Sequence, residues 1–305
     1  MTLSSLSLDE IHRRLCGAGI AMRAGPFAFR IRSPILSVAS GLSLLYADYH
    51  LVDDSEFVDF EVHLDFGAGL RRWIRPQVRF LYDGAAPFEP LPISHAVPFL
   101  EWAMNWCISS QAHQYLILHA AVVERDGFAA ILPAPSGSGK STLCAALISR
   151  GWRLLSDELT LISPGGVSIT PLARPVSLKN QSLAVIQAFE PSAEFSAVTH
   201  DTMKGAVCHM KVPKRHLDRI SECATPGWVV FPKYVHGAPA RLTPRSRASS
   251  MLELGRNAFN YTLLGRTGFD TLANVIDASA CHDFEYGSLD DAVTVFDALV
   301  EARRR

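Results

Sequence analysis

A short run of small residues that ends in Gly-Lys-Ser has the composition of a loop that surrounds phosphate groups. Residues 134–141 read Ala-Pro-Ser-Gly-Ser-Gly-Lys-Ser and match the pattern G-x-x-x-x-G-K-[ST], except that Ala134 replaces the first glycine. The backbone N–H groups of such a loop, and the positive end of the helix that follows, bind phosphate oxygens. In this pattern Lys140 neutralises the β- and γ-phosphates and the Ser141 hydroxyl binds Mg²⁺. A chance loop rich in Gly and Ser is the alternative, which the strand and helix patterns on either side disfavour.

A second polar segment could cover a phosphate that is being transferred. Residues 200–205 (His-Asp-Thr-Met-Lys-Gly) are polar, and His209 and Lys211 follow them. A mobile cationic loop and an ordinary surface loop are both compatible with this composition. We favour a phosphate-binding role for Lys204 and leave His200, His209 and Lys211 open. The predicted nucleotide-binding residues are therefore Ser136, Gly137, Ser138, Gly139, Lys140, Ser141, Thr142 and Lys204.

Two carboxylates, Asp157 and Glu158, follow Lys140 after a short interval of the chain. The apolar run 152–155 predicts a strand that ends at this pair, and ligand sites of α/β proteins gather at strand ends beside a phosphate loop. One carboxylate can bind Mg²⁺ while the other accepts the proton of an incoming hydroxyl. The sequence leaves open which does which. Both are predicted to be catalytic and metal-binding, with Ser141 as a further metal ligand and Lys140 as a further catalytic residue.

A histidine is predicted to lie beside the glycine-rich loop. Apolar runs flank Asp126-Gly127, and this dipeptide is a strong hairpin signal because both positions of a type I′ turn need positive φ. If Arg125 pairs with Phe128, counting back places His119 opposite Ala134. His119 is therefore a candidate catalytic residue, as a phosphate contact or as a proton-handling partner of the acidic pair. A purely structural histidine is the equal alternative.

Two further cations, Arg174 and Lys179, lie at the ends of the segment Arg-Pro-Val-Ser-Leu-Lys. This segment resembles a short strand. Such a cation can neutralise charge in a site or simply be exposed to solvent, and we weigh these two interpretations equally for Arg174 and Lys179.

The elements that must position these residues fall into two parts. Alternating runs at 57–66 and 73–82 predict a β-rich N-terminal region over residues 1–90, and a Pro-rich stretch then predicts a boundary before a second domain at 91–305. We predict helices at 96–112, 141–150, 249–264 and 289–303, the second ended by Gly151. In the first helix, Phe99, Trp102, Ala103, Trp106 and Cys107 are predicted to form the buried face.

Composition limits the possible partners. The 305 residues include 48% hydrophobic ones, and the formal charge of −1 with a pI near 6.8 argues against broad binding to nucleic acid or to an anionic membrane. The sequence shows no secretory signal and no apolar stretch long enough to span a bilayer. Its six cysteines form no C-x-x-C pair, which favours a reducing compartment. We therefore expect a cytoplasmic protein.

Five segments resemble those of a known family. They are 118–143 (LHAAVVERDGFAAILPAPSGSGKSTL), 150–162 (RGWRLLSDELTLI), 174–180 (RPVSLKN), 201–207 (DTMKGAV) and 257–265 (NAFNYTLLG). They are similar to segments of the bacterial HPr kinase-related "kinase A" group over most of the second domain. The similarity to HPr kinase/phosphorylase itself is limited to about residues 119–162. The chain departs from the family pattern at Ala134 and at Glu158, where the family has Gly and Asp, and it lacks the Glu-x-Arg-Gly segment of HPr kinases.

This resemblance implies an α/β P-loop kinase core of the HPr kinase and phosphoenolpyruvate carboxykinase type, with a smaller β-rich N-terminal region. It also implies use of ATP and Mg²⁺ and assembly into a homo-oligomer. His119 corresponds to the family's hairpin histidine, Lys140 and Ser141 to its loop residues, and Asp157 and Glu158 to its acidic pair.

The leading functional hypothesis is a kinase that transfers the γ-phosphoryl group of ATP to a serine hydroxyl of a peptide or protein, with a ribosomal peptide as one such acceptor. A small-molecule kinase and a non-catalytic nucleotide-binding regulator are the alternatives.

Overall fold

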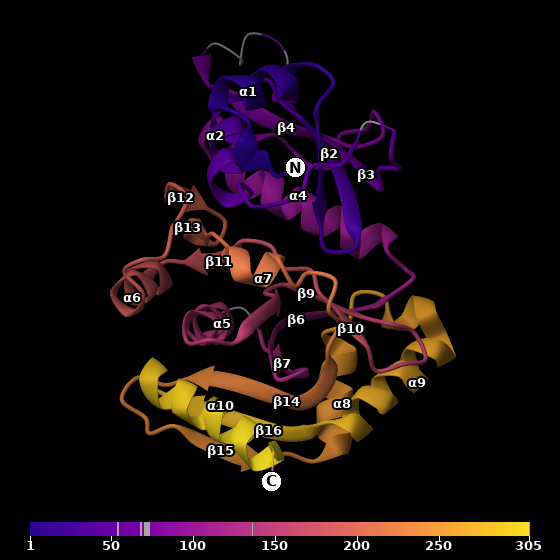
Figure 1. Cartoon of the computed structure of the whole chain (residues 1–305), viewed down its shortest axis with the longest axis vertical. Helices are drawn as coiled ribbons and strands as arrows, with labels where there is room; N and C mark the ends of the chain where they lie inside the picture. The colour runs from indigo at the N-terminus through magenta and orange to yellow at the C-terminus, as the bar shows by residue number, and fades with distance from the viewer. Residues whose placement is uncertain (54, 68, 70–73, 136, 305) are drawn as a thin grey trace.

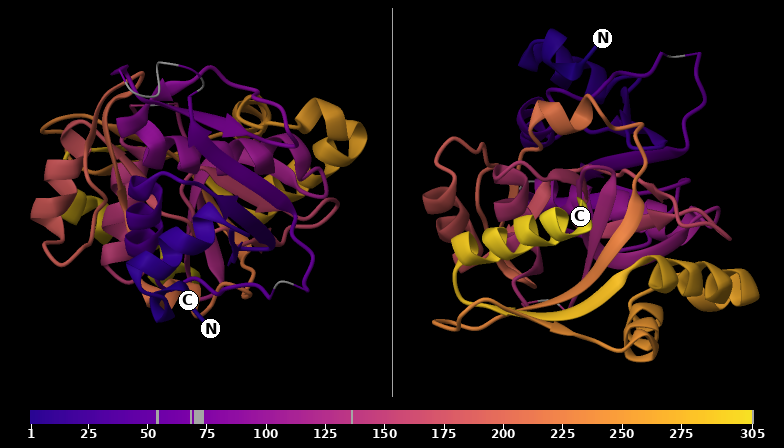
Figure 2. Two further views of the ribbon diagram at one scale, coloured as in Figure 1. Left: turned by 90° about the horizontal axis from the view of Figure 1, so that it is seen from above. Right: turned by 60° about the horizontal axis from the view of Figure 1, so that its bottom comes forward.

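The chain forms a mixed α/β structure with several sheets (Figure 1). This is a computed structural model, and it describes residues 1–53, 55–67, 69, 74–135 and 137–304. A five-stranded sheet belongs to the N-terminal part of the chain, and an eight-stranded and a three-stranded sheet belong to the rest. Seen from above, the N-terminal part lies over the other two sheets (Figure 2, left).

The N-terminal sheet has the strand order β1-β2-β3-β4-β5. Its strands are β1 (Ile20–Ala24), β2 (Phe27–Arg32), β3 (Phe60–Phe66), β4 (Gln77–Leu81) and β5 (Leu91–Pro92), and its helices are α1 (Leu8–Cys16) and α2 (Leu36–Leu45). Short 3₁₀ turns lie at Leu3–Ser5 and Ile93–His95. The apolar residues of β3 and β4 alternate with exposed ones, as in a sheet with one buried face. The strands predicted at 57–66 and 73–82 are thus present with shorter bounds.

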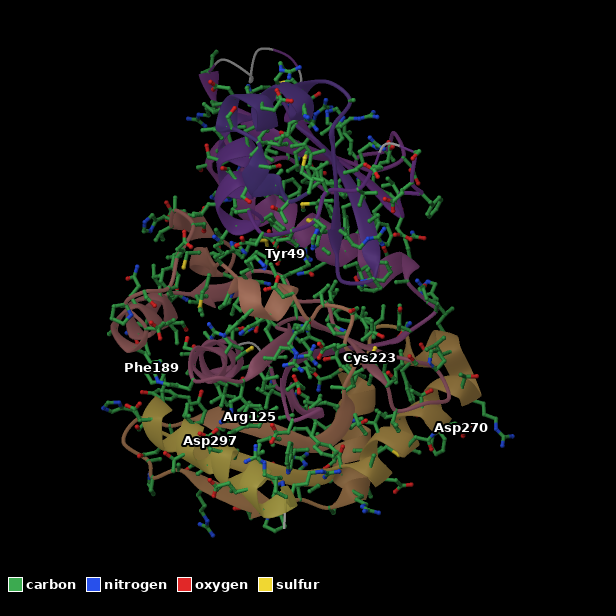
Figure 3. All side chains as sticks on the ribbon, viewed as in Figure 1. Tyr49, Arg125, Phe189, Cys223, Asp270 and Asp297 are labelled. Carbon is green, nitrogen blue, oxygen red and sulfur yellow. The ribbon has the colours of Figure 1, made fainter. Side chains whose placement is uncertain are left out.

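Helix α4 (Ala96–Gln111) lies between the N-terminal sheet and the rest of the chain (Figure 1). It packs against α2, β3 and β4 on one side and against β13 (Gly205–Met210) of the three-stranded sheet on another. Tyr49 marks the same junction in Figure 3, where its hydroxyl donates a hydrogen bond to the carbonyl of Ala173 at 2.9 Å. Helix α4, which follows the predicted domain boundary near residue 90, contacts both parts of the chain. The boundary therefore stays a prediction.

The eight-stranded sheet has the order β10-β9-β6-β7-β14-β16-β15, and β8 also pairs with β6. Its strands are β6 (Leu116–Arg125), β7 (Phe128–Pro133), β8 (Arg153–Ser156), β9 (Leu159–Ile162), β10 (Ile169–Thr170), β14 (Thr225–Tyr234), β15 (Arg241–Pro244) and β16 (Ala280–Tyr286). Strand β14 is parallel to β7 and to β16, whereas the other pairs are antiparallel.

Helices cover both faces of this sheet, which explains why its central strands are almost continuously apolar. In β7, Ala130 and Leu132 pack on the side of α5 (Lys140–Ser149) and α10 (Leu289–Arg304), whereas Ala129 and Ile131 pack on the side of α8 (Arg247–Arg256) and α9 (Tyr261–Ala278). Helix α10 runs along β14 and β16 (Figures 1 and 2). The central strands are thus held rigidly from both faces.

The third sheet has the order β11-β13-β12. It comprises β11 (Val176–Lys179), β12 (Thr199–Thr202) and β13 (Gly205–Met210), with α6 (Gln181–Phe189) after β11 and α7 (Lys214–Leu217) after β13. Because the β12–β13 turn contains Met203 and Lys204, the polar segment singled out in the sequence is a hairpin.

The predicted hairpin and its register are confirmed. Arg125 pairs with Phe128 and Ala120 with Pro133, and the turn residues Asp126 and Gly127 have φ values of 55° and 83°.

The prediction of one continuous helix at 249–264 is wrong, because residues 257–260 are not helical and separate α8 from α9. The Asn260 side chain there accepts a hydrogen bond from Ile117 N at 3.0 Å and donates one to Tyr115 O at 2.8 Å. The backbone at the start of β6 therefore requires the interruption.

Candidate active site

The sheet brings the Gly-Lys-Ser loop and the acidic pair to one edge. Strands β7 and β8 both run antiparallel to β6, so their carboxyl ends lie on the same side. Strand β7 leads into residues 134–141, the glycine loop, of which Ser136 lies outside the described residues. Strand β8 leads into Asp157 and Glu158. His119 lies on β6, the strand between them, immediately before Ala120, which pairs with Pro133.

Two glycines and two tyrosines shape the glycine loop. Gly137 and Gly139 have φ values of 87° and 92°, in the left-handed region that favours glycine. The loop is fixed by the ends of β14 and β16: Tyr234 N donates to Ser138 O at 2.9 Å, and the Tyr286 hydroxyl donates to Gly139 O at 3.0 Å. Because β14 and β16 run parallel to β7, all three strands end at this loop. No sequence pattern predicted either tyrosine contact.

Gly139 and Gly151 offer a matched test of the loop's shape. Both have positive φ, but a Cβ added at Gly139 would lie 2.5 Å from the Tyr286 hydroxyl, whereas one at Gly151 would meet nothing within 4 Å. We expect both Gly→Ala variants to lose about 1 kcal/mol of stability through backbone strain, and Gly139→Ala to lose more because its Cβ meets Tyr286. Only Gly139→Ala should weaken ATP affinity, by at least about 10-fold in calorimetric titration. Equal ATP affinity of the two variants would contradict this role of the loop.

Lys140 is almost buried at the start of α5, where it contacts His119. Its Nζ lies 3.1 Å from His119 Nε2, and only 8% of its surface is exposed. Burial lowers the pKa of Lys140, while Asp157 and Glu158 oppose that shift. Burial, and then the charge of Lys140, lowers the pKa of His119 to about 4. Neutral His119 therefore accepts the hydrogen bond from the ammonium group and orients it.

Asp157 combines deep burial with an unsatisfied oxygen. Its Oδ2 accepts a hydrogen bond from Ser177 N at 3.1 Å, whereas Oδ1 is buried without a hydrogen-bond partner. Burial, followed by repulsion from Glu158, raises the pKa of Asp157 to about 6, and the charge of Lys140, followed by interaction with the Ser141 side chain, partly opposes this. Ser141 and Asp157, which the sequence assigned to one metal site, are thus neighbours.

Glu158 lies among cations. Burial alone would raise its pKa, but Lys140 and Lys179, with smaller contributions from His119 and Lys204, lower it below the ordinary value. Lys204 on the β12–β13 turn and Lys179 on β11 line the same cavity as this carboxylate. For Lys179 the structure favours the site over simple exposure. Glu158 remains ionised at neutral pH.

The residues present are compatible with Mg²⁺ bound together with phosphates. Among the described residues no cluster of three or more His, Cys, Asp or Glu side chains could hold a metal ion by itself. A Mg²⁺ ion that accompanies a nucleotide needs only one or two carboxylates plus phosphate and water oxygens. Asp157, whose Oδ1 is unsatisfied and whose carboxyl interacts with the Ser141 side chain, could supply such an oxygen ligand.

A cavity of about 740 Å³ opens beside the acidic pair. Asp157 and Glu158 lie in its wall together with Lys179 and Lys204, and α4 and the residues before it supply another part of the wall. The volume is typical of small-ligand sites, which span about 300–1,000 Å³. A hydroxyl group in the cavity could thus reach the carboxylates.

Several candidate residues have structural contacts instead. Lys211 forms ion pairs with Asp48 and Glu194. His209, by contrast, lines the cavity and is buried with its Nδ1 unsatisfied, and burial lowers its pKa, so its role stays open. His200 is exposed, and its carbonyl oxygen lies 3.0 Å from the ring nitrogen of His95.

The hydroxyl of Thr142 donates to Ser182 on α6 at 2.8 Å. Its predicted contribution to nucleotide binding is therefore limited to its backbone N–H.

Arg174 is part of a buried polar cluster at the junction with α4. Its Nη2 lies 2.6 Å from Glu101 Oε2 and its Nη1 2.5 Å from Asn105 Oδ1, while Tyr46 donates to Glu101 at 2.7 Å. Glu101 and Arg174 are 5% and 6% exposed. The charge of Arg174 is therefore neutralised by Glu101, which the sequence did not indicate.

We expect Arg174→Met to destabilise the protein by about 3–5 kcal/mol, because the Glu101 carboxylate would stay buried without its partner. The double variant Glu101→Gln/Arg174→Met should lose less than the single one, since no unpaired charge remains. Urea denaturation of the three proteins measures both effects. A double variant less stable than the single one would contradict this explanation.

Sequence reasoning missed the aromatic part of the cavity wall. Trp102 was assigned to the buried face of its helix, but 45% of its surface is exposed and it lines the cavity. Apolar periodicity does not separate a side chain that faces a cavity from one that faces the core.

Comparison with known proteins gives two similarities. Residues 97–189, under a third of the chain, match the family model described as "SynChlorMet cassette protein ScmC". This range contains α4, the β6–β7 hairpin, the glycine loop, the acidic pair and α6. No curated protein matches the chain.

Among solved structures, the Hpr(Ser) kinase/phosphatase from Coxiella burnetii is similar at 15% sequence identity. The match covers 62% of this chain and 95% of that one, with a TM-score of 0.29. In the described residues no helix is both long enough and apolar enough to cross a membrane.

Proposed function

We propose that the protein is an ATP- and Mg²⁺-dependent kinase that phosphorylates a serine hydroxyl of a peptide or protein. The observation that carries this proposal is the convergence of Lys140, Ser141 and the unsatisfied oxygen of Asp157 beside a cavity that Glu158 also lines. A loop that binds phosphates and a carboxylate pair beside a substrate cavity are the parts that phosphoryl transfer needs.

In the proposed reaction the serine oxygen forms a bond to the γ-phosphorus while the bond from that phosphorus to the β–γ bridging oxygen breaks. ADP leaves with the bridging oxygen, and the hydroxyl proton passes to a carboxylate. Mg²⁺, when bound, neutralises charge on the β- and γ-phosphates.

Each residue of the site takes one role in this proposal. The backbone N–H groups of the glycine loop and Lys140 bind the phosphates, and His119 positions the Lys140 ammonium group. We assign Asp157 and Ser141 to the metal because they are neighbours and Asp157 has an oxygen without a partner. We assign Glu158 to the acceptor proton because it lines the cavity and is ionised.

The acceptor we propose is a peptide, and a ribosomal peptide encoded near the kinase is in keeping with the match to a cassette protein. Incubation with γ-labelled ATP, a peptide library and a metabolite panel tests this. We expect label on serine-containing peptides. Label only on a metabolite would make the protein a small-molecule kinase, and ATP binding without any transfer would contradict the kinase proposal.

A further inference from the structure

The part of the cavity wall that α4 and the residues before it supply is aromatic and presents one partly exposed tryptophan. The ring centroids of Trp102 and Phe88 are 4.1 Å apart, and Trp102 stacks on Phe99 at 5.7 Å with an interplanar angle of 23°. All three residues line the cavity, and Phe99 is 1% exposed whereas Trp102 is 45% exposed. Two neighbouring rings thus hold the indole in place while much of its surface remains free. Rigid, partly exposed aromatic side chains of this kind contribute strongly to binding.

Charge is distributed unevenly between the two sides of the cavity. Lys179 and Lys204 line the cavity together with Glu158, whose pKa they lower. On the aromatic side, Glu101 and Arg174 pair with each other. Their charges are therefore already compensated, and the surface around Trp102 suits an uncharged apolar group.

Two exposed carboxylates, Glu89 and Asp201, also line the cavity. They would repel a strongly acidic acceptor. A phosphorylated or carboxylate-rich metabolite is therefore disfavoured relative to a neutral or basic peptide.

We propose that the cavity binds an acceptor peptide in which a bulky apolar residue is next to the phosphorylated serine, with that apolar side chain packed on Trp102 and Phe88. The inference rests on the proposed kinase function and adds the sequence preference of the acceptor. A serine alone leaves most of a 740 Å³ cavity empty, whereas a short peptide segment with one large apolar side chain fills it and contacts both walls. The serine hydroxyl then faces Glu158.

Binding and transfer are measured separately, so that the two proposals can fail separately. Fluorescein-labelled peptides of one length carry a single serine flanked by Trp, Phe, Leu or Ala, and fluorescence anisotropy gives their Kd. We expect the aromatic-flanked peptides to bind at least about 10-fold more tightly than the Ala-flanked peptide. Trp102→Ala should abolish this preference, and Trp102→Phe should retain part of it. Phe269→Ala, a comparably exposed aromatic residue on α9, should leave it unchanged.

The same peptides are then tested as acceptors of label from γ-labelled ATP. Transfer with the predicted flank preference supports both proposals. Flank-dependent binding that requires Trp102, without transfer, supports the peptide site and contradicts the kinase. Transfer to every peptide with equal KM, or a preference that survives Trp102→Ala, contradicts the peptide site and leaves the kinase standing. If Trp102→Ala does not fold, the comparison of the wild-type protein with Trp102→Phe tests the peptide site. A flank preference that is weaker in Trp102→Phe supports the site, and an unchanged preference contradicts it.

Discussion

Lys140→Ala is expected to lower the rate of phosphoryl transfer at least about 100-fold while the protein stays folded. The buried ammonium group lowers the pKa of both carboxylates, and removal of one preorganised electrostatic donor from such a site costs about 10²–10³ in rate. The affinity for ATP should fall as well, because Lys140 also contacts the phosphates in the ground state. Initial rates with γ-labelled ATP and circular dichroism of the variant measure the two parts of this result.

Lys214→Ala is the matched control for this variant. Lys214 on α7 is ion-paired to Asp218 one turn further on, and 60% of its side chain is exposed. An exposed pair of this kind contributes little to stability and nothing to the site. Transfer by Lys140→Ala at the rate of Lys214→Ala would contradict the assignment of the glycine loop.

Asp157→Asn is expected to abolish transfer and, in the absence of nucleotide, to stabilise the fold at neutral pH. Burial raises the pKa of Asp157 from its ordinary 3.8 to about 6, so the folded state resists ionisation of this group. Between these two pH values the folded state retains a proton that the unfolded state has lost. The contribution of Asp157 to stability is therefore complete below pH 3.8 and decreases as the pH rises through about 6.

Asparagine has no such titration, so the advantage of Asp157→Asn should grow between pH 4 and 6 and remain constant above. A pKa difference of this size corresponds to a gain on the order of 1–3 kcal/mol at pH 7. Melting temperatures of both proteins across pH 4–8 test the sign and the pH window. Addition of Mg²⁺ and ATP should raise the Tm of the wild-type protein more than that of the variant, because only the wild-type protein keeps the carboxylate ligand.

Glu158→Gln separates the two carboxylates. Lys140 and Lys179 lower the pKa of Glu158, so its ionised form stabilises the fold above the unfolded pKa, and this contribution is lost as the pH falls through the folded pKa. Glu158→Gln should therefore lower the Tm at pH 7, opposite in sign to Asp157→Asn. The same direction of Tm shift in both variants would refute the electrostatic description of the pair.

The local parts of the site could be predicted because each rests on short-range rules. Asp126-Gly127 determines the hairpin turn and hence the register that places His119 beside the loop. Gly151, with φ of 96°, ends α5 and returns the chain into β8, which leads to the acidic pair.

The remaining parts depend on contacts between segments far apart in the sequence. Tyr286 reaches the glycine loop because β14 lies between β7 and β16 in the sheet. No local sequence pattern indicates this strand order. The pairing of Arg174 with Glu101 and the exposure of Trp102 both follow from where α4 docks. The periodicity of apolar residues indicates that a helix is amphipathic, but it does not indicate which element covers each face of the helix.

In the proposed function, the glycine loop and the acidic pair bind one metal–nucleotide complex from two sides. A crystal structure with Mg²⁺ and a non-hydrolysable ATP analogue tests it most directly. We predict the triphosphate against the backbone N–H groups of the loop, and the metal within about 2.1 Å of oxygens from Ser141 and Asp157. A nucleotide bound elsewhere, or a metal that contacts neither residue, would contradict it.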